Sequence, residues 1–196
     1  MDFWDRVAGV YDLSQTLNGR IYRELIYITG KLVPTGAKVL DCAAGTGKLT
    51  LAAAKKADRV LCTDMSENML SKAKKKANAQ GMDNITFEKR NIFALPDADE
   101  TYDVVIAGNV LHLLDNPENA VRELFRVVKK GGRLLLPTFL VKDNALIKAY
   151  KLIGFNLSAN YTPKTYREML ENAGVGEVKT KLIKGFIPCC YAVIKK

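Results

Sequence analysis

The sequence predicts an α/β fold built on a doubly wound, mostly parallel sheet with helices on both faces. Three observations predict it. Short apolar runs alternate with amphipathic helical runs from residue 37 onward, a glycine-rich turn follows the first apolar run at Gly45 and Gly47, and acids end the first two runs at Asp41 and Asp64. Ligands of open α/β sheets bind at the carboxyl ends of the strands, so the acids and the turn also predict a nucleotide or nucleoside site.

The N-terminal segment is predicted to precede the sheet as a helical cap. Residues 3–33 are expected to be helical, because apolar residues recur at helical spacing from Ile21 to Leu32. Pro34-Thr35-Gly36 then ends the helical run, since proline and glycine both interrupt regular structure.

Strands and helices alternate over the next hundred residues. The expected strands lie at residues 37–41, 59–63, 85–88, 103–107 and 133–136, and the expected helices at 47–56, 66–80 and 117–129. Ser66 is placed to cap the second of these helices, and Pro117 occupies a favoured first-turn position in the third. Gly131 and Gly132 are expected to end that third helix before the fifth strand.

The last third of the chain adds two strands to the sheet. Helices are expected at residues 143–154 and 163–173, and strands at 175–183 and 187–194 that pair as a hairpin. The whole chain therefore predicts a Rossmann-like doubly wound seven-stranded sheet with an antiparallel closing strand. No linker or repeat divides it, so residues 1–196 are expected to form a single domain capped by residues 1–33.

Composition narrows the function classes. The net charge of +9 suits a nucleic-acid or anionic-membrane surface, but many lysines gather in one helical repeat at residues 72–76, which favours a solvated helix face. No apolar run is long enough to cross a membrane, and the N-terminus lacks the layout of a secretory signal, so a cytoplasmic location is expected.

The cysteines indicate buried thiols and no metal site. All four lie in apolar, strand-like contexts without metal-ligand spacing: Cys42, Cys62, Cys189 and Cys190. The vicinal pair at residues 189–190 could be redox-active, but packing within a strand is the favoured interpretation.

Four blocks of the sequence together carry a family resemblance. They are Val39–Gly47, Thr63–Leu70, Tyr102–Val105 and Leu124–Leu134. Each resembles a motif of the class I S-adenosylmethionine-dependent methyltransferases, and the resemblance spans about residues 3–195. Tyr102 departs mildly from that family, which often has phenylalanine there. The opening Phe3-Trp4-Asp5, with Tyr11-Asp12, is similar to small-molecule members, including quinone-biosynthesis C-methyltransferases and phospholipid N-methyltransferases.

The resemblance implies S-adenosylmethionine as cofactor, with S-adenosylhomocysteine as product. Asp41 would take the ammonium of the methionine part, and backbone N–H groups of the turn would take its carboxylate. Gly45 and Gly47 would let the backbone approach the sulfonium and ribose, and Asp64 would accept both ribose hydroxyls.

The remaining implied contacts surround the adenine and the methyl group. Met65 and Ile92 would sandwich the adenine ring, while Asn91 stands where the family often has aspartate and could still reach the base through its amide. Asn109 would lie near the position of methyl transfer, and Tyr11 would either close over the cofactor or pack in the core. The predicted cofactor-binding set is Asp41, Ala43, Gly45, Gly47, Asp64, Met65, Asn91, Ile92, Asn109 and Tyr11.

No catalytic residue is assigned, because the sequence motifs indicate only how the cofactor is bound. His112, the single histidine, could act as a general base, but its neighbours are apolar, and methyl transfer depends mainly on alignment of the reactants. The predicted acceptor is a small molecule or lipid, selected by residues 1–33 and by a lid near 138–166. The acceptor's identity, the atom that is methylated and the choice between monomer and homodimer stay open.

Three alternatives remain. A nicotinamide-dependent oxidoreductase also uses an acid after its second strand, but the third glycine of its fingerprint is missing after Gly47. An RNA methyltransferase is less favoured, because Gly108-Asn109-Val110-Leu111 occupies the place of the proline-rich run of base-amine enzymes. The third is a cofactor-binding protein without transferase activity.

Overall fold

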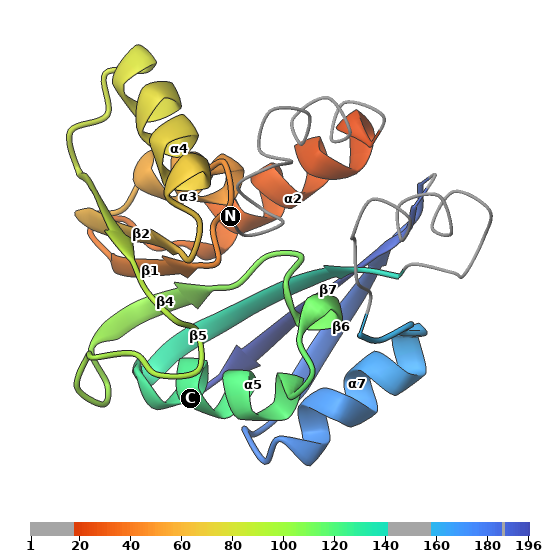
Figure 1. Ribbon diagram of the computed structural model, residues 1–196. Helices are drawn as coiled ribbons and strands as arrows, with labels where there is room; N and C mark the ends of the chain where they lie inside the picture. Colours follow the sequence, from red (N-terminus) through yellow and green to blue (C-terminus); the bar gives the residue numbers. More distant parts are fainter. Residues whose placement is uncertain (1–17, 141–157, 186) are drawn as a thin grey trace.

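The computed structural model describes residues 18–140, 158–185 and 187–196, and it confirms the predicted sheet. Seven strands lie in the order β3-β2-β1-β4-β5-β7-β6 (Figure 1). Their bounds are Lys38–Cys42 (β1), Arg59–Asp64 (β2), Ile85–Lys89 (β3), Tyr102–Ile106 (β4), Val128–Phe139 (β5), Val178–Ile183 (β6) and Cys189–Lys195 (β7). β1, β2, β3, β4 and β5 pair in parallel, whereas β7 runs antiparallel to both β5 and β6. The expected hairpin and antiparallel closing strand are therefore both present.

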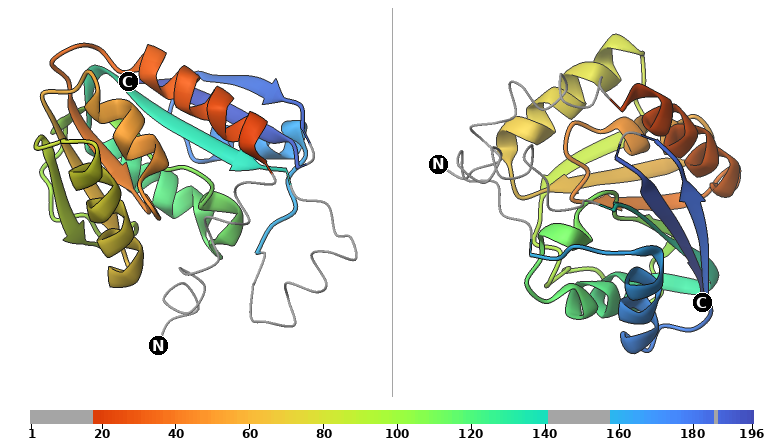
Figure 2. Two further views of the ribbon diagram at one scale, coloured as in Figure 1. Left: turned by 90° about the horizontal axis from the view of Figure 1, so that it is seen from above. Right: turned by 90° about the vertical axis from the view of Figure 1, so that its right-hand side faces the viewer.

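Helices cover both faces of the sheet (Figure 2). Their bounds are Gly19–Leu32 (α2), Lys48–Ala54 (α3), Glu67–Ala79 (α4), Pro117–Arg126 (α5) and Pro163–Asn172 (α7), with a 3₁₀ turn, η1, at Leu111–Leu113. α2, α3 and α4 lie on one face, and α5 and α7 on the other. The predicted helix starts are confirmed. The Ser66 side chain accepts from the Met69 main-chain amide at 3.2 Å, and Pro117 lies in the first turn of α5.

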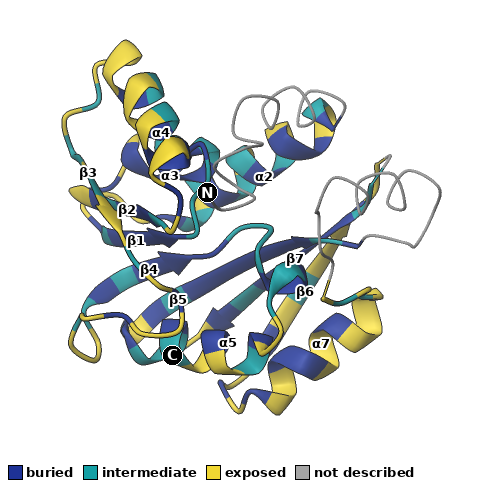
Figure 3. Ribbon diagram, in the orientation of Figure 1, coloured by how far each residue is buried: buried dark blue, intermediate teal, exposed yellow. Residues whose placement is uncertain are grey.

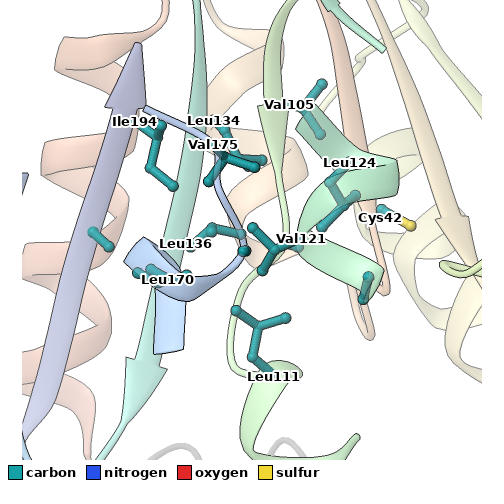
Figure 4. Close-up of a cluster of buried hydrophobic side chains, with 14 of the residues drawn as sticks. Cys42, Val105, Leu111, Val121, Leu124, Leu134, Leu136, Leu170, Val175 and Ile194 are labelled. Carbon is teal, nitrogen blue, oxygen red and sulfur yellow. The ribbon is translucent and has the colours of Figure 1, made fainter. Parts of the chain in front are cut away.

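The core is continuous across the face that carries α5 and α7. Figure 4 shows Val121 and Leu124 of α5 facing Leu134 and Leu136 of β5, with Leu170 of α7 beside them. All five side chains are fully buried. The central strands are buried on both faces while the outer surfaces of α4 and α7 face solvent, as Figure 3 shows. Burial on both faces explains why the central strands are near-continuous apolar runs.

The predicted boundary between the third helix and the fifth strand is wrong. α5 ends at Arg126 instead of residue 129, and β5 begins at Val128 instead of residue 133. The glycines lie inside the strand, where the register with β4 shifts, and Gly131 has φ +77°. A Cβ on Gly132 would lie 2.8 Å from the carbonyl oxygen of Asp103, so close backbone packing also demands a glycine there.

Several predictions fall partly or wholly outside the described residues. Of the helical segment 3–33, the structure describes α2, and residues 1–17 lie outside. The helix expected at 143–154 and most of the lid near 138–166 also lie outside, because residues 141–157 are not described. The capping role of residues 1–33 stays a prediction. In the described part of the chain, no helix is long and apolar enough to cross a membrane.

All four cysteines are buried free thiols, as the sequence predicts. Cys42 ends β1, Cys62 lies in β2, and Cys189 and Cys190 begin β7. Burial raises the pKa of the Cys42 thiol to about 12, so it stays protonated at neutral pH. Within the described ranges, no cluster of three or more potential ligands could hold a metal ion.

Candidate functional site

A cavity of about 290 Å³ opens at the carboxyl ends of the parallel strands. Its position agrees with the general rule for open α/β sheets. The lining residues come from β1 and β2, from the loops that follow β1, β2, β3 and β4, from η1 and the residue after it, and from the helices α2, α3 and α4: Tyr22, Asp41, Ala43, Ala44, Gly45, Thr46, Lys48, Leu49, Asp64, Met65, Met69, Arg90, Ile92, Gly108, Asn109, Val110, Leu113 and Leu114. The cavity thus brings together seven of the ten predicted cofactor-binding residues.

The turn after β1 has an unusual backbone. Ala43, Gly45 and Gly47 have φ of +54°, +56° and +79°, so three alternate residues are left-handed. The strain falls on Ala43, because a residue with a Cβ seldom adopts the left-handed backbone conformation. Hydrogen bonds fix the loop, since the Ala44 amide donates to the Thr63 carbonyl at 2.9 Å and the Gly45 amide to the Asp64 carboxylate at 2.8 Å.

Gly47 does not line the cavity but packs against α4 next to it. It immediately precedes α3, and a Cβ on Gly47 would lie 2.9 Å from the Cβ of Ala73 in α4. Positive φ and this close contact both require glycine. The structure therefore gives Gly47 a reason that the sequence did not indicate, namely the close approach of α3 and α4.

Asp64 is held in place by two backbone donors. Its Oδ2 accepts from the Gly45 amide at 2.8 Å, and its Oδ1 accepts from the Ser66 amide at 2.9 Å. A carboxylate is an acceptor at both oxygens, and Asp64 also lines the cavity. The β2 carboxylate is thereby pre-positioned.

Asp41 is a buried carboxyl with one unsatisfied oxygen. The residue is 1% exposed, its Oδ2 accepts from the Thr50 hydroxyl at 2.6 Å, and its Oδ1 has no hydrogen-bond partner among the described residues. Burial, with a smaller contribution from the negative charge of Asp64, raises the pKa of Asp41 to about 7. A cation at Oδ1 would satisfy this oxygen and favour the ionised form.

Asn109 carries the second unsatisfied buried oxygen of the site. It follows β4 with φ +57°, and its main-chain N–H donates to the Pro137 carbonyl at 2.7 Å. Its Oδ1 is buried without a partner in the described structure. Gly108 beside it is tightly packed, since a Cβ there would lie 2.6 Å from Cδ1 of Leu49. Buried unpaired acceptors are rare in folded proteins and often mark a ligand site.

The β3 end of the cavity combines apolar and cationic groups. Met65 is 49% exposed and Ile92 is buried, and both line the cavity. Arg90 lines it too, because Lys89 pairs with Asp64 and places the next residue at the strand end. Asp97 and Glu88 hold the guanidinium by hydrogen bonds.

Asn91 points elsewhere. It is exposed, its Oδ1 accepts from the Phe93 amide at 3.0 Å, and it does not line the cavity. The sequence pattern aligned Asn91 with the acid of the family motif and missed Arg90 one position earlier. A side chain engaged with its own loop cannot be recognised from spacing alone.

His112 is buried outside the cavity lining. Its Nδ1 lies 3.0 Å from the Thr138 hydroxyl, and burial lowers its pKa to about 4. Leu113 and Leu114, from the same turn, do line the cavity. Tyr11, the last predicted residue, lies outside the described ranges.

Two residues of the cavity lining were not predicted. Tyr22 of α2 and Lys48 of α3 both line the cavity, and the Lys48 ammonium lies 4.4 Å from the centroid of the Tyr22 ring. Helical periodicity places Tyr22 on the buried face of α2, but it does not say what that face meets.

Comparisons with known proteins agree with this geometry. A family model described as a methyltransferase domain matches residues 35–174. The ubiquinone/menaquinone biosynthesis C-methyltransferase UbiE of Hydrogenovibrio crunogenus is 34% identical over 79% of this chain and 64% of its own length. UbiE of Roseobacter denitrificans is 37% identical over 77% of this chain and 63% of its own length. The chain thus spans less than two thirds of the length of these relatives.

Solved structures share the fold at low sequence identity. A chain from the complex between the Haloferax volcanii Trm112 methyltransferase activator and a methyltransferase superposes with a TM-score of 0.83 at 17% identity, covering 100% of this chain and 98% of that one. Haemonchus contortus phosphoethanolamine N-methyltransferase 2, in complex with S-adenosyl-L-methionine, gives 0.72 at 15% identity over 88% of this chain and 52% of its own. With the family match over most of the chain and relatives at 34% and 37% identity, the chain belongs to the class I S-adenosylmethionine-dependent methyltransferase family.

Proposed function

We propose that this chain transfers a methyl group from S-adenosylmethionine to a small-molecule acceptor. One observation carries the proposal. The carboxylates of Asp41 and Asp64, the left-handed turn between β1 and α3, and the unsatisfied oxygens of Asp41 and Asn109 all meet at one cavity. This combination of acceptors suits a ligand with a cationic amine at one point and hydroxyl groups at another.

The methionine part of the cofactor fits the β1 end. Asp41 Oδ1 is an acceptor in need of a donor, and an ammonium provides both the hydrogen bond and the opposite charge. Thr50 already holds the other oxygen, so the carboxyl plane is fixed before the ligand arrives.

The nucleoside part fits the β2 and β3 ends. Asp64 is a carboxylate acceptor in the cavity lining for the ribose hydroxyls, and Met65 and Ile92 offer apolar surface for the adenine ring. Arg90, anchored by Asp97, adds a planar donor at the same end. Asn91 is not needed for this arrangement.

When bound, the cofactor supplies a methyl group activated by its sulfonium. The protein has to align that methyl group with the acceptor and keep water away, and such alignment can contribute on the order of 7–11 kcal/mol of a barrier. Gly108 and Asn109 lie at the β4 end of the cavity, where Leu113 and Leu114 form an apolar wall. No described side chain at that wall has the properties of a general base.

The acceptor class is inferred from the walls and from the relatives. The UbiE proteins named above are C-methyltransferases of ubiquinone and menaquinone biosynthesis, and we infer a similar apolar, ring-bearing acceptor for this chain. The apolar side chains at the β4 end support it: Leu49, Val110, Leu113 and Leu114.

Calorimetry separates the proposal from its rivals. Titration with S-adenosylhomocysteine is expected to show one-site binding, and titration with NADH none. Binding of NADH alone would establish the oxidoreductase alternative instead. Incubation with methyl-labelled cofactor and a lipid extract should then label a small molecule, whereas binding of the cofactor without any labelled product would indicate a non-enzymatic role.

A further inference from the structure

The β3 end of the cavity is lined by an arginine that two carboxylates hold in place. Arg90 directly follows β3 and lines the cavity, and its side chain is only 13% exposed. Its Nε and Nη2 donate to Oε2 of Glu88 at 3.0 and 2.7 Å, and its Nη1 donates to Oδ2 of Asp97. The plane of the guanidinium is therefore fixed before any ligand binds.

Asp97 is itself held by a tyrosine of β4. The Tyr102 hydroxyl donates to Oδ1 of Asp97 at 2.7 Å, so one carboxylate connects the phenol to the guanidinium. Tyr102 is buried, and the Asp97 side chain is 13% exposed. A phenylalanine at this position would leave Asp97 without the hydroxyl donor. Tyr102 and Asp97 thus form a support that ends at Arg90 in the cavity lining.

The charge of Arg90 is compensated, but its hydrogen-bonding capacity is not exhausted. Two carboxylates contact one guanidinium, so an anionic ligand gains little from its charge there. A guanidinium has five N–H groups, and within the described residues the hydrogen bonds to Glu88 and Asp97 use three of them. Each terminal nitrogen keeps one N–H group. A neutral ligand with two acceptor atoms therefore matches Arg90 better than an anion does.

The side-chain amide next to Arg90 is turned away from the cavity. Asn91 is exposed and does not line the cavity. Its Oδ1 accepts from the Phe93 main-chain N–H at 3.0 Å, and its carbonyl accepts from the Ala94 N–H at 3.2 Å. An amide side chain recognises adenine, because adenine offers an amino donor and the acceptor N7 at one edge. Asn91 does not offer its amide to a base in this arrangement.

The expected position of the ribose directs the base toward Arg90. In the proposed function, Asp41 of β1 takes the ammonium and Asp64 of β2 takes the ribose, and β3 is the next strand after β2 in the sheet. The main-chain N–H of Arg90 donates to the Asp64 carbonyl at 3.3 Å, so the two residues are neighbours. The base would then lie against Met65 and Ile92, with Arg90 at its edge.

We propose that the β3 end of the cavity accepts a 6-oxopurine base, with Arg90 donating to its O6 and N7 atoms. This inference rests on the proposed function, and it names the base selectivity that the cofactor motifs leave open. Cationic side chains most often recognise guanine through O6 and N7, because both atoms are acceptors. Adenine keeps only N7 at that edge and turns an amino donor toward the guanidinium. The ligand class is therefore the S-inosyl counterpart of S-adenosylhomocysteine, in which hypoxanthine replaces adenine.

The test compares two ligands that differ in the base alone. The full chain is titrated by calorimetry with S-adenosylhomocysteine and with S-inosylhomocysteine. The wild type should bind the S-inosyl ligand at least as tightly as the S-adenosyl ligand. R90M should lose roughly tenfold in affinity for the S-inosyl ligand, as expected for hydrogen bonds from a charged group. The same variant should lose less than about threefold for S-adenosylhomocysteine, and this retained binding shows that it is folded.

Three further variants separate hydrogen-bond geometry from charge. R90K keeps a cation without the planar fork, so it should lose nearly as much S-inosyl affinity as R90M. Y102F removes the hydroxyl that holds Asp97 and should cost the S-inosyl ligand about threefold. R59M removes an arginine of β2 whose side chain is 69% exposed, and it should leave both affinities unchanged.

A wild type that binds S-adenosylhomocysteine more tightly than the S-inosyl ligand would overturn the inference. So would an R90M variant that changes both affinities by the same factor, because Arg90 would then serve a part that the two ligands share. A wild type that binds neither ligand contradicts the proposed function instead, so the two failures are distinguishable.

Discussion

The two ends of the cavity are built by different means. At the nucleoside end, the β1–α3 turn and Asp64 are fixed by main-chain hydrogen bonds, as in the pairs from Gly45 and Ser66 to the carboxylate. Other lining side chains come from three separate elements, namely Tyr22 of α2, Lys48 of α3 and Leu113 of η1. In the proposed function, donor binding would therefore depend mainly on residues close together in the sequence, and acceptor binding on the packing of distant segments.

The largest expected effect comes from Asp64. D64A removes the carboxylate that holds two backbone amides and the candidate ribose acceptor, so S-adenosylhomocysteine affinity should fall roughly 100-fold. Calorimetry measures the affinity, and D58A is the matched control, because the Asp58 side chain is 60% exposed and forms an ion pair with its neighbour Arg59. D64N keeps one acceptor oxygen and should lose less. Unchanged affinity in D64A would place the ribose elsewhere.

This contrast explains how far the sequence could predict the site. Asp41, Gly45 and Asp64 were found because strand, turn and acid are adjacent in the chain, so their spacing carries the geometry. Lys48 and Tyr22 are separated by the whole of β1 and its turn, and only the packing of α2 on α3 brings them together.

The same reasoning covers the fold. The existence of the strands and the antiparallel closing pair were predicted from apolar runs and turn residues, whereas the boundary between α5 and β5 was not. Gly131 and Gly132 were interpreted as a helix stop, but they belong to an irregular strand, where Gly131 has a positive φ and Gly132 packs against the Asp103 carbonyl. Glycine marks positions where a Cβ is excluded, and sequence alone does not say which neighbour excludes it.

The turn itself supplies the second test of the nucleoside end. G47A adds a Cβ 2.9 Å from that of Ala73 at a residue with φ +79°, so it should reduce the free energy of unfolding by about 2 kcal/mol. Denaturant titration measures the loss. Because A73G alone places a glycine inside α4 at a cost of about 1 kcal/mol, the contact is isolated by a double-mutant cycle, in which G47A should cost less in the A73G background than in the wild type. Equal costs of G47A in the two backgrounds would show that the contact is unimportant.

The third effect is the pH dependence of stability caused by the buried carboxyl of Asp41. Because burial raises the pKa of this carboxyl from 3.8 to about 7, its contribution to stability is present at low pH and is lost as the pH rises toward 7. D41N removes the buried charge, so its Tm should exceed that of the wild type by roughly 5 °C near pH 8 and by much less near pH 5. Thermal melts across this range measure the difference.

Stability should fall as Asp41 ionises, whereas affinity for S-adenosylhomocysteine should rise. An ammonium needs the ionised carboxylate, so wild-type S-adenosylhomocysteine affinity should fall below about pH 7, and D41N should lose roughly tenfold near pH 8. A calorimetric titration in two buffers of different ionisation enthalpy would reveal the proton released by the wild type. Identical pH dependence in D41N would mean that another group carries the linkage.

The smallest effect is expected at His112, and it tests whether the acceptor end contains a base. Burial lowers the pKa of His112 to about 4, and its Nδ1 lies 3.0 Å from the Thr138 hydroxyl, so the ring should stay neutral throughout the physiological range. The chain has a single histidine, so the two carbon-bound ring protons of His112 are the imidazole signals to follow in a proton NMR spectrum. Its chemical shift should stay flat from about pH 5.5 to 8.5, whereas an exposed histidine would titrate near 6.5. Because the folded-state pKa is depressed, the stability it contributes is present above about pH 6.5 and is lost as the pH falls toward 4, a loss that H112Q should reduce. An inflection near 6.5 that moves when S-adenosylhomocysteine binds would instead make His112 the base that the described cavity wall otherwise lacks.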